Sequence, residues 1–287
     1  MILRGDFVLT YTTLASGSSG NCALVCCGGT RLLLDAGISA RRITTALKGL
    51  GVDPASLGGV LVTHEHSDHI SGLATLTKQL GLPVYATAPT LRQLCYRIPF
   101  LECLCRDFAP GDGFPVGELW VTSFPTSHDA ACSVGYTLAG DGSKLASATD
   151  LGRLTPEVLN AVRGCDLLVC ESNHDVDWVR SGPYPYYLKE RILGDRGHLS
   201  NEMGAELAAL AAESGARAVV LAHLSSENNT PARARDVAAR RLSAAGVDPE
   251  RDLSLTVAPR KERGPVFRLE RGRDVQALRP REEAVLC

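Results

Sequence analysis

Short hydrophobic runs alternate with longer amphipathic stretches along the chain. Apolar runs of strand length come first, at about residues 7–35, and the helical spacing of residues 39–50 follows them. A second strand-rich half spans about residues 105–150 and is followed by helical patterns near 156–163 and 202–213. Strands interleaved with helices in this way indicate an α/β protein.

One hydrophobic run, residues 60–62, leads directly into a segment with metal-binding chemistry. Positions 64–69 read His-Glu-His-Ser-Asp-His, so three imidazoles and an aspartate lie within six residues. Imidazole nitrogens and carboxylate oxygens are ligands for a divalent cation such as zinc. The helical zinc-protease motif H-E-x-x-H does not fit, because the second His comes two positions after the first and the helical pattern begins only at Ile70. The segment predicts a metal-binding loop; a polar loop that is merely rich in His is the alternative.

Three further hydrophobic runs end close to a residue that can bind a metal ion. The runs near positions 120, 145 and 220 are followed by His128, Asp150 and His223. Ligands at the ends of several strands converge at one edge of a sheet, so these residues are expected to complete the site that the loop begins.

This order of residues, H-x-H-x-D-H and then His, Asp and His after successive strands, resembles the metallo-β-lactamase superfamily of binuclear metallohydrolases. Within it, the stretches 15–21, 171–175, 197–201 and 223–229 resemble the YycJ/WalJ-like group of bacterial single-domain proteins. The resemblance implies a four-layer αββα sandwich, the metallo-β-lactamase fold. The function proposed for the group is a 5′-to-3′ exonuclease activity on DNA.

The resemblance also implies ligands for two divalent metal ions, Zn²⁺ or Mn²⁺. The first ion would be held by His64, His66 and His128, the second by Asp68, His69 and His223, and Asp150 would bridge them. Asp35 matches an early Asp of the superfamily that orients the loop and a ligand His without binding metal. Two such ions lower the pKa of a bridging water and stabilise negative charge on a phosphodiester in the transition state.

Asp68 and His198 are the candidates for direct roles in catalysis. The metal ions supply no proton for the leaving alkoxide, so His198 is expected to act as that acid or to grip the phosphate. It precedes the helical pattern at 202–213, for which Ser200 or Asn201 is the expected N-cap, and a helix N-terminus favours anions. A His buried in a loop without such a role is the alternative.

Further polar residues are expected to support the ligands or to contact substrate. Glu171 is expected to support a ligand, and His174 either to line the substrate groove or to support a ligand. The Ser/Gly-rich loop around Ser18 is either a phosphate nest or a tight hairpin turn. The full set is Asp35, Ser18, Asn21, Glu171, Asn173, His174, Ser200 and Asn201.

Residues 182–189 hold three tyrosines among glycine and proline residues. They predict an irregular insertion over the edge that carries the site. Exposed tyrosines can stack on nucleic-acid bases, but we favour the interpretation that these pack the insertion onto the body of the protein as a lid.

The composition restricts the functions and the location that can be expected for the chain. The net charge of the 287 residues is −2, whereas nucleic-acid-binding domains are commonly basic. A long apolar run and a secretory signal are both lacking and the 10 cysteines form no C-x-x-C pair, which predicts a cytoplasmic protein with reduced thiols and no membrane partner. We expect one domain over residues 1–275 and a flexible tail at 276–287; the oligomeric state cannot be predicted.

The leading hypothesis is a metal-dependent phosphodiesterase that cleaves nucleic acid, DNA rather than RNA, from one end. A thioester or acyl hydrolase of the glyoxalase II type shares the same ligands. Such relatives add a C-terminal helical domain, whereas strand-like residues 253–257 and 266–269 occur here. A phosphodiesterase acting on small, for example cyclic, molecules is a further alternative. A non-catalytic binding or sensor module would predict broken ligands, and the intact ligand set argues against it.

Overall fold

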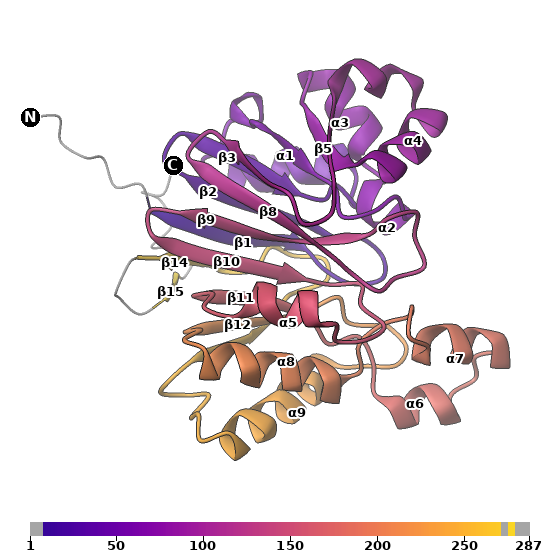
Figure 1. Cartoon of the computed structure of the whole chain (residues 1–287), viewed down its shortest axis with the longest axis vertical. Coiled ribbons are helices and arrows are strands. Elements are labelled where there is room, and N and C mark those ends of the chain that lie inside the picture. Colours follow the sequence, from indigo (N-terminus) through magenta and orange to yellow (C-terminus); the bar gives the residue numbers. More distant parts are fainter. Residues whose placement is uncertain (1–7, 271–274, 279–287) are drawn as a thin grey trace, which may run out of the picture.

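The computed structural model describes residues 8–270 and 275–278, and within them two β-sheets pack face to face (Figure 1). The first sheet contains, in spatial order, β15 (Gln276–Leu278), β14 (Val266–Leu269), β1 (Leu9–Ala15), β2 (Cys22–Cys27), β3 (Thr30–Leu34), β4 (Gly59–Leu61), β5 (Val84–Thr87) and β6 (Cys105–Phe108). The second contains β13 (Ser254–Val257), β12 (Ala218–Ala222), β11 (Leu167–Glu171), β10 (Ser143–Ala148), β9 (Val134–Gly140), β8 (Leu119–Pro125) and β7 (Gly113–Val116).

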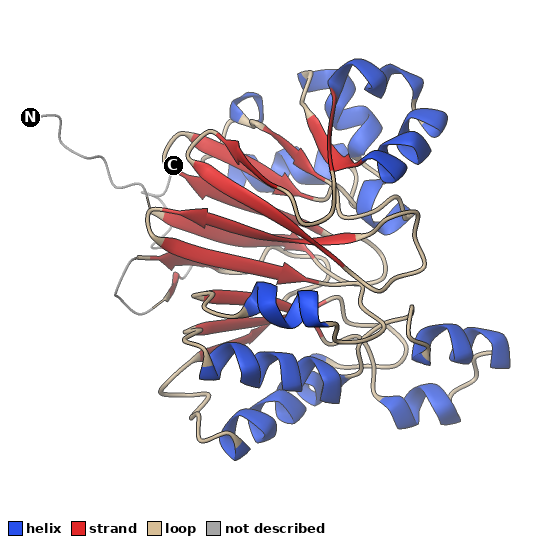
Figure 2. Cartoon of the chain, viewed as in Figure 1, coloured by secondary structure: helices blue, strands red, loops and turns tan. Residues whose placement is uncertain are grey.

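Helices cover the outer face of each sheet, as Figure 2 shows. The first sheet carries α1 (Ala40–Gly49), α3 (Leu73–Leu80) and α4 (Ala88–Arg97), and the second carries α5 (Pro156–Val162), α8 (Asn201–Glu213) and α9 (Pro231–Ala244). Shorter elements are η1 (Pro54–Ser56), α2 (Ser67–Ile70) and η2 (Pro99–Leu104). The predicted four-layer αββα sandwich is confirmed. Among the described residues, every helix is too short or too polar to span a membrane.

The hydrophobic runs form strands because each sheet is covered on both faces. Side chains alternate along a strand, so Leu9 and Tyr11 of β1 enter the layer between the sheets. They share that core with Tyr136 and Leu138 of β9, and each of the four is at most 3% exposed. β12 is buried at every position, the pattern of a strand that is covered on both sides.

The carboxyl ends of several strands meet at one edge of the sandwich. β3 to β6 run parallel in the first sheet, and β10 to β13 run parallel in the second. β8 has the same direction as β10, because both are antiparallel to β9. The loops that follow β4, β8, β10, β11 and β12 therefore lie close enough to build one site.

The prediction of an irregular insertion over residues 182–189 is wrong from Tyr186 onward. Two helices, α6 (Val176–Ser181) and α7 (Tyr186–Leu193), project beyond the sheets at the edge where the strands end (Figure 1). Pro185 is the N-cap of α7, where the missing N–H of proline breaks no helical hydrogen bond. Tyr186 and Tyr187 are 76% and 73% exposed, so they do not pack as a lid.

The predicted C-terminal tail contains a strand at its start. Gln276–Leu278 form β15, which pairs antiparallel with β14 at the edge of the first sheet. Residues 279–287, the rest of that tail, lie outside the described residues.

Candidate metal centre

Asp35 anchors the loop that follows β4. It comes directly after β3 and has a left-handed φ of 58°, a conformation that Asp adopts more readily than most residues. Its Oδ1 accepts a hydrogen bond from the N–H of Thr63 at 2.8 Å, and its Oδ2 lies 2.7 Å from Nδ1 of His69. A carboxylate at Nδ1 keeps a proton on that nitrogen and leaves Nε2 of His69 to bind a metal ion. This geometry supports the orienting role predicted for Asp35.

Replacing Asp35 with alanine is expected to weaken metal binding by about 10- to 100-fold, the usual loss when the partner behind a ligand His is removed. Asp35→Asn keeps an acceptor for Thr63 and is expected to lose less. Competition with a chromophoric zinc chelator measures the affinity, and circular dichroism checks the fold. An alanine variant that binds metal as tightly as the wild type would contradict the orienting role.

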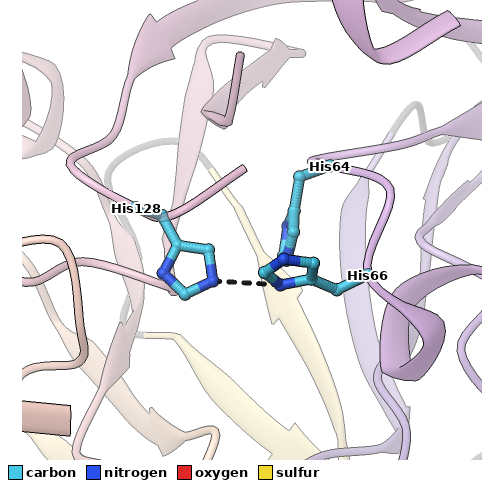
Figure 3. Close-up of side chains that lie close together, drawn as sticks. All are labelled: His64, His66 and His128. Atoms are coloured by element: carbon cyan, nitrogen blue, oxygen red, sulfur yellow. Dashed lines mark hydrogen bonds between the residues drawn. The ribbon is translucent and has the colours of Figure 1, made fainter. Parts of the chain in front are cut away.

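Three histidines contributed by both sheets form a first cluster. His64 and His66 come from the loop after β4 and His128 from the loop after β8, and one ring nitrogen of each lies within 4.8 Å of the others. Figure 3 shows Nε2 of His128 facing Nδ1 of His66, at 3.2 Å. Nδ1 of His128 contacts the carbonyl of Gly197 at 3.1 Å, which directs Nε2 into the cluster. Nε2 of His64 is buried and has no hydrogen-bond partner among the described residues, which fits a metal ligand.

Asp68, His69 and His223 form a second cluster beside the first, with ligand atoms within 4.8 Å of one another. Asp68 and His69 lie in the short helix α2, so the prediction that the helical pattern begins only at Ile70 is wrong. Oδ2 of Asp68 lies 3.4 Å from Nε2 of His69 and from Nε2 of His223. Asn21, in the turn between β1 and β2, donates from Nδ2 to the same oxygen at 3.3 Å. The carboxylate of Asp68 is thus held by groups from three separate parts of the chain.

Asp150 lies between the two clusters. Its Oδ2 is 3.3 Å from Nε2 of His69, and its Oδ1 is 3.5 Å from Nε2 of His223 and 3.7 Å from Nε2 of His128. Asp150 and His223 have left-handed φ values of 61° and 56°, each just after a buried strand. Backbone strain of this kind is typical of functional sites. The Asp150 carboxylate therefore reaches both clusters from one position.

Burial and neighbouring charges shift the pKa values of these groups, in several cases in opposite directions. Burial raises the pKa of the Asp150 carboxyl, but the surrounding imidazoles, that of His223 foremost, outweigh burial and hold this pKa well below its usual range. Burial lowers the pKa of His64 well below its usual value, so this ring stays neutral. Burial also lowers the pKa of His223, yet Asp150 and Asp68 raise it to about 10, so a metal ion has to displace a proton there.

Glu171, at the end of β11, connects the second cluster to His198. Its fully buried carboxylate has Oε1 at 2.7 Å from Nδ1 of His198 and at 3.0 Å from Nδ1 of His223. Its Oε2 accepts hydrogen bonds from the N–H groups of Leu151 at 2.9 Å and Leu199 at 3.1 Å. Because both oxygens are engaged in this way, Glu171 positions the two rings and has little capacity left for a metal ion. Burial raises the pKa of Glu171, but His198 outweighs burial and lowers it to about 2, so the carboxylate is ionised.

His198 lies against the clusters from the loop before α8. Its ring centroid is 5.2 Å from that of His223 and 5.1 Å from that of His128, and its side chain is 23% exposed. Burial lowers the pKa of His198, but Glu171 outweighs burial and raises it above its ordinary value. The raised pKa favours the protonated ring, and Nε2, which Glu171 does not contact, is the nitrogen that can donate the proton.

The remaining predicted residues divide between the cavity and the interior. Ser18 lines a cavity of about 200 Å³ over the clusters. Asn173, His174 and Asn201 lie behind it and are at most 4% exposed. Nδ2 of Asn173 donates to the carbonyl of His223 at 2.9 Å. His174 is therefore placed to support the site from within and does not line the groove.

Ser200 and Asn201 have different roles at the start of α8. Ser200 is the N-cap, and its hydroxyl accepts a hydrogen bond from the N–H of Met203 at 3.3 Å. Oδ1 of Asn201 accepts from the hydroxyl of Ser172 at 2.6 Å and from Nδ2 of Asn229 at 2.8 Å. Asn201 thus belongs to a buried polar network beneath the clusters.

Two further charged residues, Asp129 and Arg191, line the cavity. Nε of Arg191 donates to Oδ2 of Asp129 at 2.6 Å, and Oδ1 of Asp129 is 3.5 Å from Nε2 of His128. Asp129 directly follows the predicted ligand His128, so its place in the sequence already indicates that it lies near the site. No local pattern connects it to Arg191, which is 62 residues away.

Comparisons with known proteins bear on the family of the chain. A profile described as "Beta-lactamase superfamily domain" matches residues 30–224. Exodeoxyribonuclease YycJ of Bacillus anthracis is 39% identical over 230 residues, which are 79% of this chain and 86% of that protein. Exodeoxyribonuclease WalJ of Streptococcus pneumoniae is 37% identical over 222 residues, which are 76% of this chain and 82% of that protein.

A solved structure shows the same fold. The metallo-β-lactamase fold protein YhfI from Bacillus subtilis superposes with a TM-score of 0.68 at 18% identity, covering 91% of this chain and all of that one (100%). The clustered His and Asp side chains in this fold indicate that the chain binds a divalent metal ion. The resemblance seen in the sequence is confirmed: the chain belongs to the metallo-β-lactamase superfamily and, within it, to the YycJ/WalJ-like group of metal-dependent hydrolases.

Proposed function

We propose that the chain is an exonuclease that removes nucleotides from the 5′ end of DNA at a two-metal centre. The two relatives named exodeoxyribonucleases match it over more than four fifths of their own length, which supports DNA as the substrate. The observation that carries the proposal is the position of Asp150, which lies within 3.7 Å of a histidine of each cluster. Two ligand sets that share one carboxylate suit the hydrolysis of a phosphodiester.

In this proposal each cluster holds one ion, Zn²⁺ or Mn²⁺, both of which accept mixed imidazole and carboxylate ligands. The ligands are His64, His66 and His128 for one ion, Asp68, His69 and His223 for the other, and Asp150 for both. When bound, such a pair of ions supplies an activated water and stabilises charge on the attacking and leaving oxygens of the phosphodiester.

Side chains of the protein move the proton and position the phosphate. His198 donates the proton of Nε2 to the oxygen that leaves the phosphorus. Glu171 holds Nδ1 of the same ring at 2.7 Å, which keeps the donating nitrogen turned toward the cavity. Arg191 lines this cavity, and its guanidinium can bind a phosphate oxygen.

The acyl-hydrolase alternative lacks comparable support. Within the described residues, β12 is followed by α9 and then by β13, β14 and β15, and no helical domain follows there. Neither of the two relatives named above carries an acyl-hydrolase name.

Cleavage of 5′-labelled and 3′-labelled single-stranded DNA by the metal-loaded enzyme tests the proposal. We expect mononucleotides to be released in order from the 5′ end, and RNA of the same sequence to be cleaved more slowly. Parallel assays use a thioester and a cyclic nucleotide. An enzyme that hydrolyses either of these and leaves DNA intact would contradict the proposal.

A further inference from the structure

Helix α7, which lines part of the metal cavity, exposes an aromatic side chain. Leu188, Arg191 and Ile192 of this helix line the cavity. Tyr187 directly precedes Leu188 and lies one helical turn before Arg191, so it flanks the cavity-lining face of the helix. It is 73% exposed. A large ring next to the cavity is thus left in contact with solvent.

Core packing does not account for the position of this helix. All eight residues of α7 are described, and none of them is buried. The helix contributes a wall to the cavity through Leu188 and Ile192, and its contact with the body includes the ion pair of Arg191 with Asp129, at 2.6 Å. The ion pair holds the segment that carries Tyr187 beside the first cluster, because Asp129 follows the candidate ligand His128.

The cavity is too small to enclose a whole nucleotide together with its neighbours. Its volume is about 200 Å³, below the range of roughly 300 to 1,000 Å³ that is typical of pockets enclosing a drug-sized ligand. A phosphate fits within it, next to the clusters, so the bases on either side of a scissile phosphate have to lie on the surrounding surface. Tyr187 is exposed on the helix that lines the cavity, so its ring is available to a base on that surface.

We propose that Tyr187 is a stacking site for a base of single-stranded DNA whose scissile phosphate lies in the metal cavity. The inference rests on the proposed nuclease function, and it specifies where the DNA strand runs beside the metal cavity. Stacking on an aromatic ring tolerates any base, because every base has a π-face. A stacking tyrosine therefore suits an exonuclease that must process successive nucleotides of any sequence.

Tyr186 offers a matched control on the same helix. It is 76% exposed, close to the value for Tyr187. It comes two positions before Leu188 and six before Ile192, which places it on the opposite side of the helix from the cavity. Tyr186 and Tyr187 therefore share residue type, exposure and helix, and differ in the direction they face.

Steady-state cleavage of single-stranded DNA by the metal-loaded enzyme tests the inference. In Tyr187→Ala we expect KM to rise by about 5- to 100-fold, which corresponds to the loss of one stacked base. Tyr187→Phe keeps the ring and is expected to retain the wild-type KM, as is Tyr186→Ala. A second substrate, a strand with abasic residues, removes the bases. The wild type is expected to bind it more weakly than normal DNA, and Tyr187→Ala is expected to lose this preference.

The outcomes separate this inference from the function on which it rests. If the wild type cleaves DNA and Tyr187→Ala has the same KM as Tyr186→Ala, Tyr187 does not stack on substrate and the inference fails alone. If Tyr187→Ala keeps the full preference for base-bearing strands, the inference also fails. If the wild type itself leaves DNA intact while hydrolysing bis(p-nitrophenyl) phosphate, the proposed nuclease function fails first and the stacking site fails with it.

Discussion

Replacing Asp150 with asparagine is expected to slow DNA hydrolysis by about a thousandfold, equivalent to about 4 kcal/mol in the activation barrier. The carboxylate is 2% exposed and lies within 3.7 Å of ring nitrogens of His69, His128 and His223. Asparagine has nearly the same size but no charge, so both proposed metal sites would lose the ligand that they share. Metal content, measured by mass spectrometry, is expected to fall together with activity.

Asp141 supplies the matched control for this variant. It is also an acidic residue with a positive φ, 48°, but it is exposed and lies in the turn between β9 and β10, at the other end of β10. Asp141→Asn is expected to keep the wild-type activity and metal content. A folded Asp150→Asn protein with wild-type metal content and rate would exclude Asp150 as the shared ligand.

Replacing His198 with alanine is expected to slow DNA cleavage by about 100- to 10,000-fold, the range for loss of a general acid. The loss is expected to be smaller for bis(p-nitrophenyl) phosphate, because p-nitrophenolate leaves as a stable anion and gains little from protonation. The values of kcat for the two substrates, with metal content measured in parallel, give the comparison. Equal losses on both substrates would show that His198 binds the phosphate and does not donate the proton.

The variant Glu171→Gln tests the same role of His198, proton donation, through the pH dependence of kcat. Glu171 raises the pKa of His198 against the effect of burial, so removing its charge lowers that pKa. The acid works only while His198 is protonated, and activity falls as the pH rises through its pKa. The alkaline limb of the pH profile for kcat is therefore expected to move to lower pH in Glu171→Gln. An unchanged limb would exclude His198 as the group that titrates there.

The metal-binding loop could be predicted because its side chains are neighbours in the sequence. His64 and His69 lie within six residues, directly after a hydrophobic run, and imidazoles and carboxylates gathered so closely are typical of a metal site. The buried strands could be predicted for a similar reason, since a strand covered on both faces is a continuous apolar run.

Contacts between distant segments could not be predicted in the same way. The ion pair of Arg191 with Asp129 depends on how α7 folds back over the edge of the sheets, which no local pattern encodes. Helix α7 itself is hidden in the sequence because Pro183 and Pro185 are typical of irregular structure. Both prolines precede the first turn of the helix, where they are compatible with it. The position of Glu171 between His198 and His223 likewise arises only when β11 and β12 pair.

Each cluster takes side chains from both halves of the sandwich: the segment after β4 in the first sheet, including α2, and the loops after β8, β10 and β12 in the second. Metal ions at this edge would act as cross-links between the sheets. A ligand that binds only the folded state adds about 4 kcal/mol to stability when it is present at roughly a thousand times its Kd. The melting temperature should therefore follow metal supply, and in a metal-starved cell the protein should be degraded sooner, so that its abundance falls together with its activity.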